Sequence, residues 1–248
     1  MAEIRIERGG EAVAQAAAEL LIADLHTAAQ QNGVATWVAA GGSTPGRAYE
    51  VLAQAPDTGL WKQVRVLMGD ERCVAPDHED SNWRQLDARL LSKVAIPRDH
   101  LLRPPAELGA ETAAERYEAT LRRLPAIENG IPRLDHLWLG LGEDGHTLSL
   151  FPDHPGLDAG GLVAPVHNSP KPPPDRITLT FAALAGTRNC VILAAGEGKR
   201  EAVTRALSGD TALPIARAVS VIEGSGGNVV WLLDEAIAPR SGSTPFTS

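Results

Sequence analysis

The chain contains little of what marks several large classes of protein. Its 248 residues include two cysteines, too few for the dense disulfide framework of a small secreted protein. Acidic residues (31) outnumber lysine and arginine (23), and the formal net charge of −8 disfavours nucleic acid as a partner. No apolar run approaches the ~20 residues of a membrane span, and the N-terminus lacks a signal peptide's charged head and apolar middle. We therefore expect a cytoplasmic protein that binds neither nucleic acid nor membrane.

Motifs that identify common cofactor and metal sites are also missing. The sequence has no GxxxxGK[ST] loop, no GxGxxG fingerprint with its acidic partner, no HExxH and no cysteine cluster. Side chains able to ligate a metal do occur, at Asp77, His78, Asp144, His146 and His154. Because their spacing matches no known metal motif, we expect no metal site, and a metal hydrolase is disfavoured.

What the chain has in quantity is apolar sequence arranged in short runs. Apolar residues make up 44% of it, enough for a large core. A first strand is expected at residues 3–7, and continuous apolar runs lie near residues 34–40, 64–68, 134–141, 190–195 and 228–233. Continuous runs that alternate with helical patterns are typical of parallel strands buried on both faces. The sequence therefore predicts an α/β fold with a Rossmann-like, doubly wound, mostly parallel sheet.

Two segments depart from this alternation. Residues 152–175 are rich in Pro, Gly and His, and we expect them to form a loop or small subdomain over the site. Residues 239–248 have the composition of a linker and are expected to be a flexible tail. We thus expect one α/β domain over residues 1–238.

The most informative segment follows the strand expected at residues 134–141. It continues through a glycine-rich turn that carries Asp144 and His146. Ligands of open α/β sheets bind at the carboxyl ends of the strands, so both side chains are expected to face a cleft. A neutral imidazole can act there as a general base near neutral pH. A loop histidine without chemistry is the alternative.

A second strand, at residues 36–40, leads into Gly41, Gly42, Ser43, Thr44 and Pro45. Glycine backbone amides, two hydroxyls and the positive end of a helix begun by Pro45 suit an oxyanion such as phosphate. An ordinary strand-to-helix turn uses the same residue types for conformational reasons alone.

The strand at residues 64–68 delivers a third polar loop, with Asp70 and Arg72. Arg176 and Lys199 occupy comparable positions beside later strands, and each of these cations taken alone is typical of a solvated surface. Lys199 is expected in the first turn of a helix, where a lysine is unfavourable unless an anion is bound. Cys73, next to Arg72, is the candidate for a reactive thiol, and neither cysteine is assigned to catalysis.

These segments belong to a larger ordered set. It comprises Gly-Gly-Ser-Thr-Pro at 41–45, Gly-Asp-Glu-Arg at 69–72, Asp-Ser-Asn at 80–82, Gly-Glu-Asp-Gly-His-Thr at 142–147, Ser-Leu-Phe-Pro at 149–152, Pro-Asp-Arg-Ile-Thr at 174–178, Gly-Glu-Gly-Lys-Arg at 196–200 and Pro-Ile-Ala at 214–216. In order and spacing the set resembles the 6-phosphogluconolactonase family, over residues 12–233. The resemblance implies a cofactor-free enzyme that opens 6-phosphoglucono-1,5-lactone, a phosphorylated sugar lactone, to 6-phosphogluconate in the oxidative pentose phosphate pathway.

The expected mechanism is direct hydrolysis, with His146 as the base that activates water. Asp144 orients the imidazole or only caps the turn, and Arg72 stabilises the oxyanion or binds phosphate. Phosphate binding is assigned to Gly42, Ser43 and Thr44 with Arg176 and Lys199, and Asp70 is expected to hold the Arg72 loop, with a substrate-hydroxyl contact as its second possible role.

Two other functions compete with this one. The family that this chain resembles shares its fold with glucosamine-6-phosphate deaminases and, more distantly, with sugar-phosphate isomerases. The deaminases, however, follow the Asp-Gly-His turn with Asn-Glu-Pro where this chain has Leu150, Phe151 and Pro152. A sugar-phosphate-sensing domain is the non-catalytic alternative, although no basic helix-turn-helix segment accompanies it.

Leu148 stands where the lactonases usually have a small residue. The sequence leaves the oligomeric state open, a monomer included.

Overall fold

The computed structural model describes residues 2–56 and 59–238, and its centre is a six-stranded parallel sheet. In spatial order the strands are β1 (Glu3–Glu7), β9 (Asn228–Asp234), β8 (Thr187–Ala194), β5 (Leu134–Gly140), β2 (Ala35–Ala39) and β3 (Val64–Met68). All five neighbouring pairs run parallel. The mostly parallel, doubly wound sheet predicted from the apolar runs is therefore confirmed.

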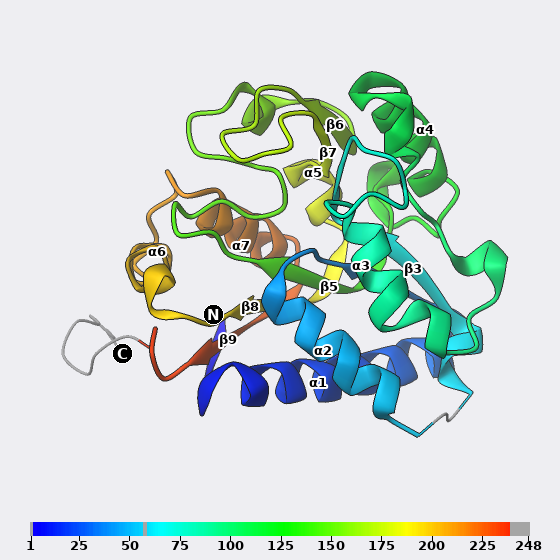
Figure 1. Cartoon of the computed structure of the whole chain (residues 1–248), viewed down its shortest axis with the longest axis horizontal. Helices are drawn as coiled ribbons and strands as arrows, with labels where there is room; N and C mark the ends of the chain where they lie inside the picture. The colour runs from blue at the N-terminus through cyan, green and yellow to red at the C-terminus, as the bar shows by residue number, and fades with distance from the viewer. Residues whose placement is uncertain (1, 57–58, 239–248) are drawn as a thin grey trace.

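Helices cover both faces of this sheet (Figure 1). One face carries α1 (Gly9–Asn32) and α2 (Ser43–Gln54), with α3 (Asn82–Arg89) beside α2; the other carries α4 (Ala110–Leu121), α5 (Phe181–Leu184), α6 (Arg200–Leu207) and α7 (Pro214–Gly224). Single-turn 3₁₀ helices lie in the connections: η1 (Leu60–Gln63), η2 (Leu91–Lys93), η3 (Arg98–His100), η4 (Ala106–Leu108), η5 (Glu128–Gly130), η6 (Pro155–Asp158) and η7 (Glu197–Lys199).

The middle of strand β5 illustrates why a strand that is buried on both faces needs successive apolar residues. Leu137 and Leu139 point into the core beneath α4 and α7, whereas Trp138 between them packs on the opposite face with Trp37 and Tyr49. Because side chains alternate across a strand, burial on both faces requires an apolar residue at nearly every position.

A second, smaller sheet stands over the carboxyl ends of the first. It has three antiparallel strands in the order β4 (Asp70–Arg72), β7 (Arg176–Leu179) and β6 (Val163–Val166). Residues 69–72 were expected to be a polar loop, but Asp70–Arg72 form strand β4. They do so because β7, a segment distant in the sequence, supplies their strand partners, with Arg72 opposite Arg176. The subdomain expected from residues 152–175 is present as β6 and η6.

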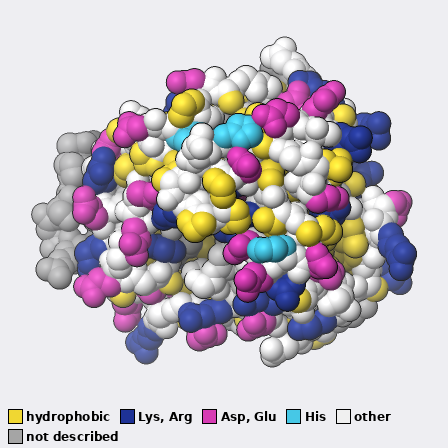
Figure 2. All heavy atoms as spheres, turned by 45° about the horizontal axis from the view of Figure 1, so that its top comes forward, with side chains coloured by type: hydrophobic (Ala, Val, Ile, Leu, Met, Phe, Trp, Pro, Cys, Tyr) yellow, Lys and Arg dark blue, Asp and Glu magenta, His cyan; other side chains and the backbone are white. Residues whose placement is uncertain are grey.

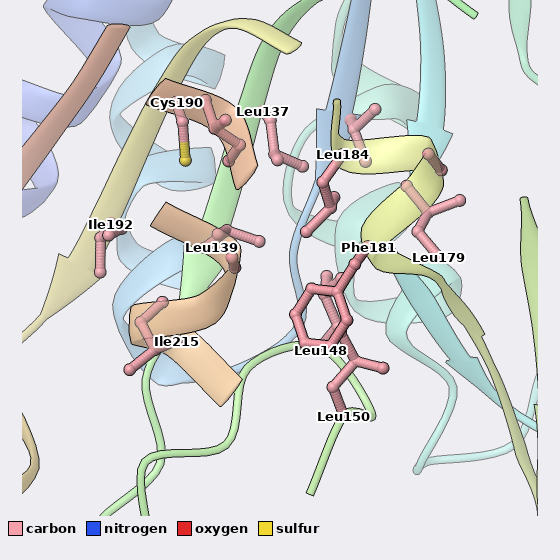
Figure 3. Packing of buried hydrophobic residues seen from close by; sticks show 14 of the residues in the cluster. Leu137, Leu139, Leu148, Leu150, Leu179, Phe181, Leu184, Cys190, Ile192 and Ile215 are labelled. Carbon is pink, nitrogen blue, oxygen red and sulfur yellow. The ribbon is translucent and has the colours of Figure 1, made fainter. Parts of the chain in front are cut away.

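The small sheet rests on an apolar layer. In Figure 3, Leu148 and Leu150 of the loop after β5 lie beside Phe181, at the start of α5. All three are buried in the same cluster as Leu139 and Ile215 of the main core. The loops that carry the predicted site residues are thus fixed from below by hydrophobic packing.

Charged side chains of both signs share the face seen in Figure 2, with acidic groups placed between the basic ones. Among the described helices, none has the length and apolar character that a membrane crossing requires. The tail predicted at residues 239–248 lies outside the described residues.

Candidate active site

A pocket of about 470 Å³ opens where the carboxyl ends of β2, β3, β5 and β8 meet the small sheet. Its walls include nearly all of the residues predicted from the sequence: Gly42, Ser43, Thr44, Asp70, Arg72, His146, Arg176 and Lys199. Asp144 lies directly behind His146. Asn82, Glu143 and Lys171 also line the pocket and had no predicted role, and Leu148 forms part of its wall.

His146 and Asp144 form a close pair in the turn after β5. The distance from His146 Nδ1 to Asp144 Oδ1 is 2.5 Å, and the backbone N–H of His146 donates to the same oxygen at 3.2 Å. A carboxylate against Nδ1 keeps the proton of a neutral imidazole on that nitrogen, which leaves the lone pair on Nε2. The ring is 18% exposed and packs on Phe151, with 4.7 Å between ring centroids.

The protonation states of the pair follow from this environment. Burial lowers the pKa of His146 below its ordinary value, although the hydrogen bond to Asp144 opposes the shift. Burial alone would raise the pKa of Asp144, but its hydrogen bond with His146 prevails and lowers it. Near neutral pH the pair is therefore a neutral imidazole beside a carboxylate, the state required of a general base.

The loop after β2 presents the amino end of α2 to the pocket. The helix begins at Ser43, two residues before the proline expected to start it, and Gly42 is its N-cap with φ 112°. An L side chain rarely adopts this φ, so a glycine suits the position. No side chain caps the helix, and its first N–H groups face the pocket together with the hydroxyls of Ser43 and Thr44.

Glu71, which the sequence left without a role, holds the segment after β3 in place. Its buried carboxylate accepts hydrogen bonds from the backbone N–H groups of Arg72, Asn82 and Trp83 and from the hydroxyl of Ser81. Burial raises the pKa of Glu71, and the backbone donors counteract that rise.

Asp70 joins the same segment to the loop after β5. It accepts a 2.6 Å hydrogen bond from the Ser149 hydroxyl and a 3.4 Å bond from the Asn82 amide, and one edge of it lines the pocket. Buried polar residues of this kind cannot be told from solvated loop residues in a sequence. Glu71 gave no sequence signal beyond its place in the Gly-Asp-Glu-Arg segment at 69–72.

Arg176 is 4% exposed, and most of its donors are already engaged. Its Nε donates to the carbonyl of Pro173 at 3.0 Å, and Nη2 donates to the carbonyls of Lys171 and Pro172 at 2.8 and 2.9 Å. Nη1 points toward Ser149, with 3.4 Å to its hydroxyl. Of this guanidinium, Nη1 is the nitrogen left for a ligand.

The other two predicted cations, Arg72 and Lys199, also line the pocket. Arg72 donates from Nη1 to the Asp80 carbonyl at 2.6 Å. Lys199 is the last residue of η7 and the N-cap residue of α6, so it lies immediately before the helical turn in which it was expected. Burial lowers the pKa of Lys199, although Glu143 and Asp234 favour its charged form.

Other groups singled out in the sequence lie elsewhere. His78 pairs with Asp80, and His154 bonds to the His167 carbonyl; among the residues described, no three His, Cys, Asp or Glu side chains are grouped to hold a metal. Burial raises the pKa of Cys73 to about 12, which argues against the reactive thiol expected there.

Leu148 has an unusual backbone conformation for a leucine. Its φ is 54°, in the left-handed region that favours glycine, and its side chain packs against Gly69. A leucine here is held in place by the apolar layer of Figure 3.

Comparison with known proteins agrees with this geometry. The family model described as glucosamine-6-phosphate isomerases/6-phosphogluconolactonase matches residues 8–231. The human 6-phosphogluconolactonase is 40% identical over 203 residues, which are 80% of this chain and 77% of the human one. The structure of 6-phosphogluconolactonase from Leishmania guyanensis superposes with a TM-score of 0.86 at 28% identity, covering 97% of this chain and 99% of that one. A monomeric glucosamine-6-phosphate deaminase has the same fold, with a TM-score of 0.78 at 18% identity. This chain belongs to the glucosamine-6-phosphate isomerase/6-phosphogluconolactonase family.

Proposed function

We propose that the protein hydrolyses 6-phospho-D-glucono-1,5-lactone to 6-phospho-D-gluconate, a reaction of the oxidative pentose phosphate pathway. The observation that carries the proposal is the His146 ring in the pocket wall, paired through Nδ1 with the Asp144 carboxylate. The carboxylate holds the proton of the neutral ring on Nδ1, so Nε2 is the nitrogen that can accept a proton. The 40% identity to a 6-phosphogluconolactonase over most of the chain supports the same substrate.

In the reaction, Nε2 of His146 takes a proton from water as the water oxygen adds to the lactone carbonyl carbon. The tetrahedral intermediate then breaks its bond to the ring oxygen, which receives the proton back from the imidazolium. The products are a carboxyl group and the freed hydroxyl, so one water is consumed and no cofactor is needed. Asp144 holds the ring and stabilises the imidazolium between the two steps.

The rest of the pocket binds the substrate. The amides and hydroxyls of Gly42, Ser43 and Thr44, together with Lys199 and, directly or through the loop that it holds, Arg176, are assigned to the phosphate dianion, which is best bound by several charge-assisted donors. Arg72 is assigned to the developing oxyanion, with phosphate binding as its second possible role. Asp70 keeps acceptor capacity at the pocket wall for a substrate hydroxyl.

Phe151 disfavours the deaminase reading. Deaminases resembling this chain carry a glutamate at the corresponding position of the motif, whereas here a fully buried phenyl ring packs against His146. The carboxyl needed for ring-opening chemistry on an amino sugar is absent from that place. A non-catalytic sensor would have no need of a base held neutral beside a carboxylate.

The test is turnover by the purified protein. We expect 6-phosphogluconolactone to disappear faster than its spontaneous hydrolysis, measured by proton release in weak buffer. Glucosamine 6-phosphate should yield no ammonia. Binding of the lactone without consumption would identify a sensor, and ammonia release would identify a deaminase.

A further inference from the structure

Lysine is scarce in this chain, and its distribution is uneven. Of the 23 basic residues, only four are lysines: Lys62, Lys93, Lys171 and Lys199. Two of these four line the pocket. Lys62 and Lys93 are exposed residues of η1 and η2, in the connections on either side of β3 and α3.

Lys171 reaches the pocket from the loop between β6 and β7. Its side chain is 45% exposed, and its Nζ lies 3.8 Å from Asp144 Oδ1, beyond the range of a good hydrogen bond. The ammonium therefore has donors left for a ligand. The sequence placed it only within residues 152–175, the loop or small subdomain expected over the site, and gave the lysine itself no role.

Arg176 determines where this loop runs. Its guanidinium binds three successive carbonyl oxygens, those of Lys171, Pro172 and Pro173. A second contact lies just outside: His167 bridges Asp175 and Glu111, at 2.8 and 2.7 Å, and so ties the loop to α4. The backbone of Lys171 is thus fixed although its side chain is exposed.

Lys171 and Lys199 are close enough to oppose each other's charge. Burial lowers the pKa of Lys199, Glu143 and Asp234 oppose that shift, and the Lys171 ammonium adds to it. Both ammonium groups line the same pocket, so an anion bound there can contact both. A phosphate dianion has the charge to satisfy both.

We propose that Lys171 is a phosphate ligand acting with Lys199, and that Arg176 is a positioning residue that sets the Lys171 loop. The inference rests on the proposed function for the identity of the phosphate ester. Arg176 then contributes to phosphate recognition mainly through Lys171, because most of its own donors are bound to the loop.

Kinetics with two substrates test the binding role. Lys171→Ala should lower kcat/KM for 6-phosphogluconolactone by roughly 10- to 150-fold, the equivalent of one charge-assisted hydrogen bond. Its effect on unphosphorylated glucono-1,5-lactone should be far smaller. Lys171→Arg should recover most of the loss, and Lys62→Ala is the matched control. An equal loss on both lactones would place Lys171 with the Asp144–His146 pair, and no loss would remove it from the site; either result overturns the proposal.

A binding measurement separates this inference from the proposed activity. Reductive methylation with ¹³C-formaldehyde keeps the charge of each lysine and gives one NMR signal for each of the four, assigned by Lys→Arg variants. Inorganic phosphate should shift the Lys171 and Lys199 signals and leave those of Lys62 and Lys93 in place, with chloride at equal ionic strength as the control. A response of Lys199 without Lys171 contradicts the proposal. If both respond but no lactone is hydrolysed, the proposed function fails and the anion site stands.

A double-variant comparison tests the role of Arg176. If it acts through the loop, Arg176→Ala should cost little in a Lys171→Ala background, although it costs much alone. Losses that multiply would mean that Arg176 contacts the phosphate itself. Turnover of glucono-1,5-lactone reports whether the variant is folded; if it is not, Arg176→Lys, which cannot reproduce the three carbonyl bonds, replaces it.

Discussion

At the scale of single residues, the chemistry depends on one ring nitrogen. Replacing His146 by alanine removes the proposed base, so we expect kcat to fall by roughly 10²–10⁴-fold while KM changes by only a few fold. Rapid-quench or proton-release assays, corrected for spontaneous hydrolysis, measure this. Near-normal turnover by the variant would show that another group activates water.

The pH dependence follows from the burial of the same ring. Because the pKa of His146 is lowered from its ordinary value of about 6.5, the imidazole stays neutral to a lower pH than a solvated histidine would. The base is present above the folded pKa and is lost as pH falls through it. We therefore expect kcat/KM to be maintained below pH ~6.5 and to decline only in more acidic solution.

Asp144→Asn separates the two roles open to Asp144. An amide cannot fix the proton on Nδ1 as a carboxylate does, so an orienting role predicts a loss of roughly 10- to 10³-fold in kcat. The carboxylate also raises the pKa of His146, so the acid limb of the residual activity should move to lower pH. Asp153→Asn, an exposed carboxylate in the same loop region, is the control. A turn-capping role alone would leave both the rate and the limb nearly unchanged.

At the scale of elements, the segment between β4 and α3 depends on a buried carboxylate. In Glu71→Gln, one oxygen that accepts backbone N–H groups becomes an NH₂ that faces those donors. We expect a loss of roughly 1.5–3 kcal/mol in the free energy of unfolding, measured by urea denaturation. Glu79→Gln, at an exposed position of the same segment, should change it little. A stable Glu71→Gln protein would mean that the loop can be rebuilt around an amide.

The strands also differ in how clearly local sequence patterns predict them. In strand β5 the apolar run Leu137–Leu139 predicts its own burial, whereas Asp135 and His136 of the same strand are equally buried without any local signal for it. Strand β4 consists of Asp70, Glu71 and Arg72, which no local pattern identifies as a strand. It exists because β7, more than 100 positions later, supplies its hydrogen-bond partners and because Glu71 is satisfied by α3.

At the scale of the whole molecule, the proposed chemistry needs no metal. We expect activity to survive prolonged incubation with EDTA, since the imidazole rather than a metal-bound hydroxide is assigned to water activation. The assay is lactone hydrolysis before and after chelation and desalting. Loss of activity that Zn²⁺ or Mg²⁺ restores would require the carboxylates and histidines around the pocket to be reassigned as ligands. The cytoplasmic location stays a prediction.

The sequence by itself determined the features whose causes are local. Two-sided apolar strands can be buried only between helices, and the Asp144–His146 pair forms within a single turn, two residues apart. The tertiary structure alone decided which partners the polar side chains have: the pairing of β4 with β7 across more than 100 positions, the accepting role of Glu71, and the placing of Lys171 by Arg176. Only the first of these joins distant segments, but none has a local pattern, because a polar side chain has the same appearance in a sequence whether its partner is water or a buried carbonyl.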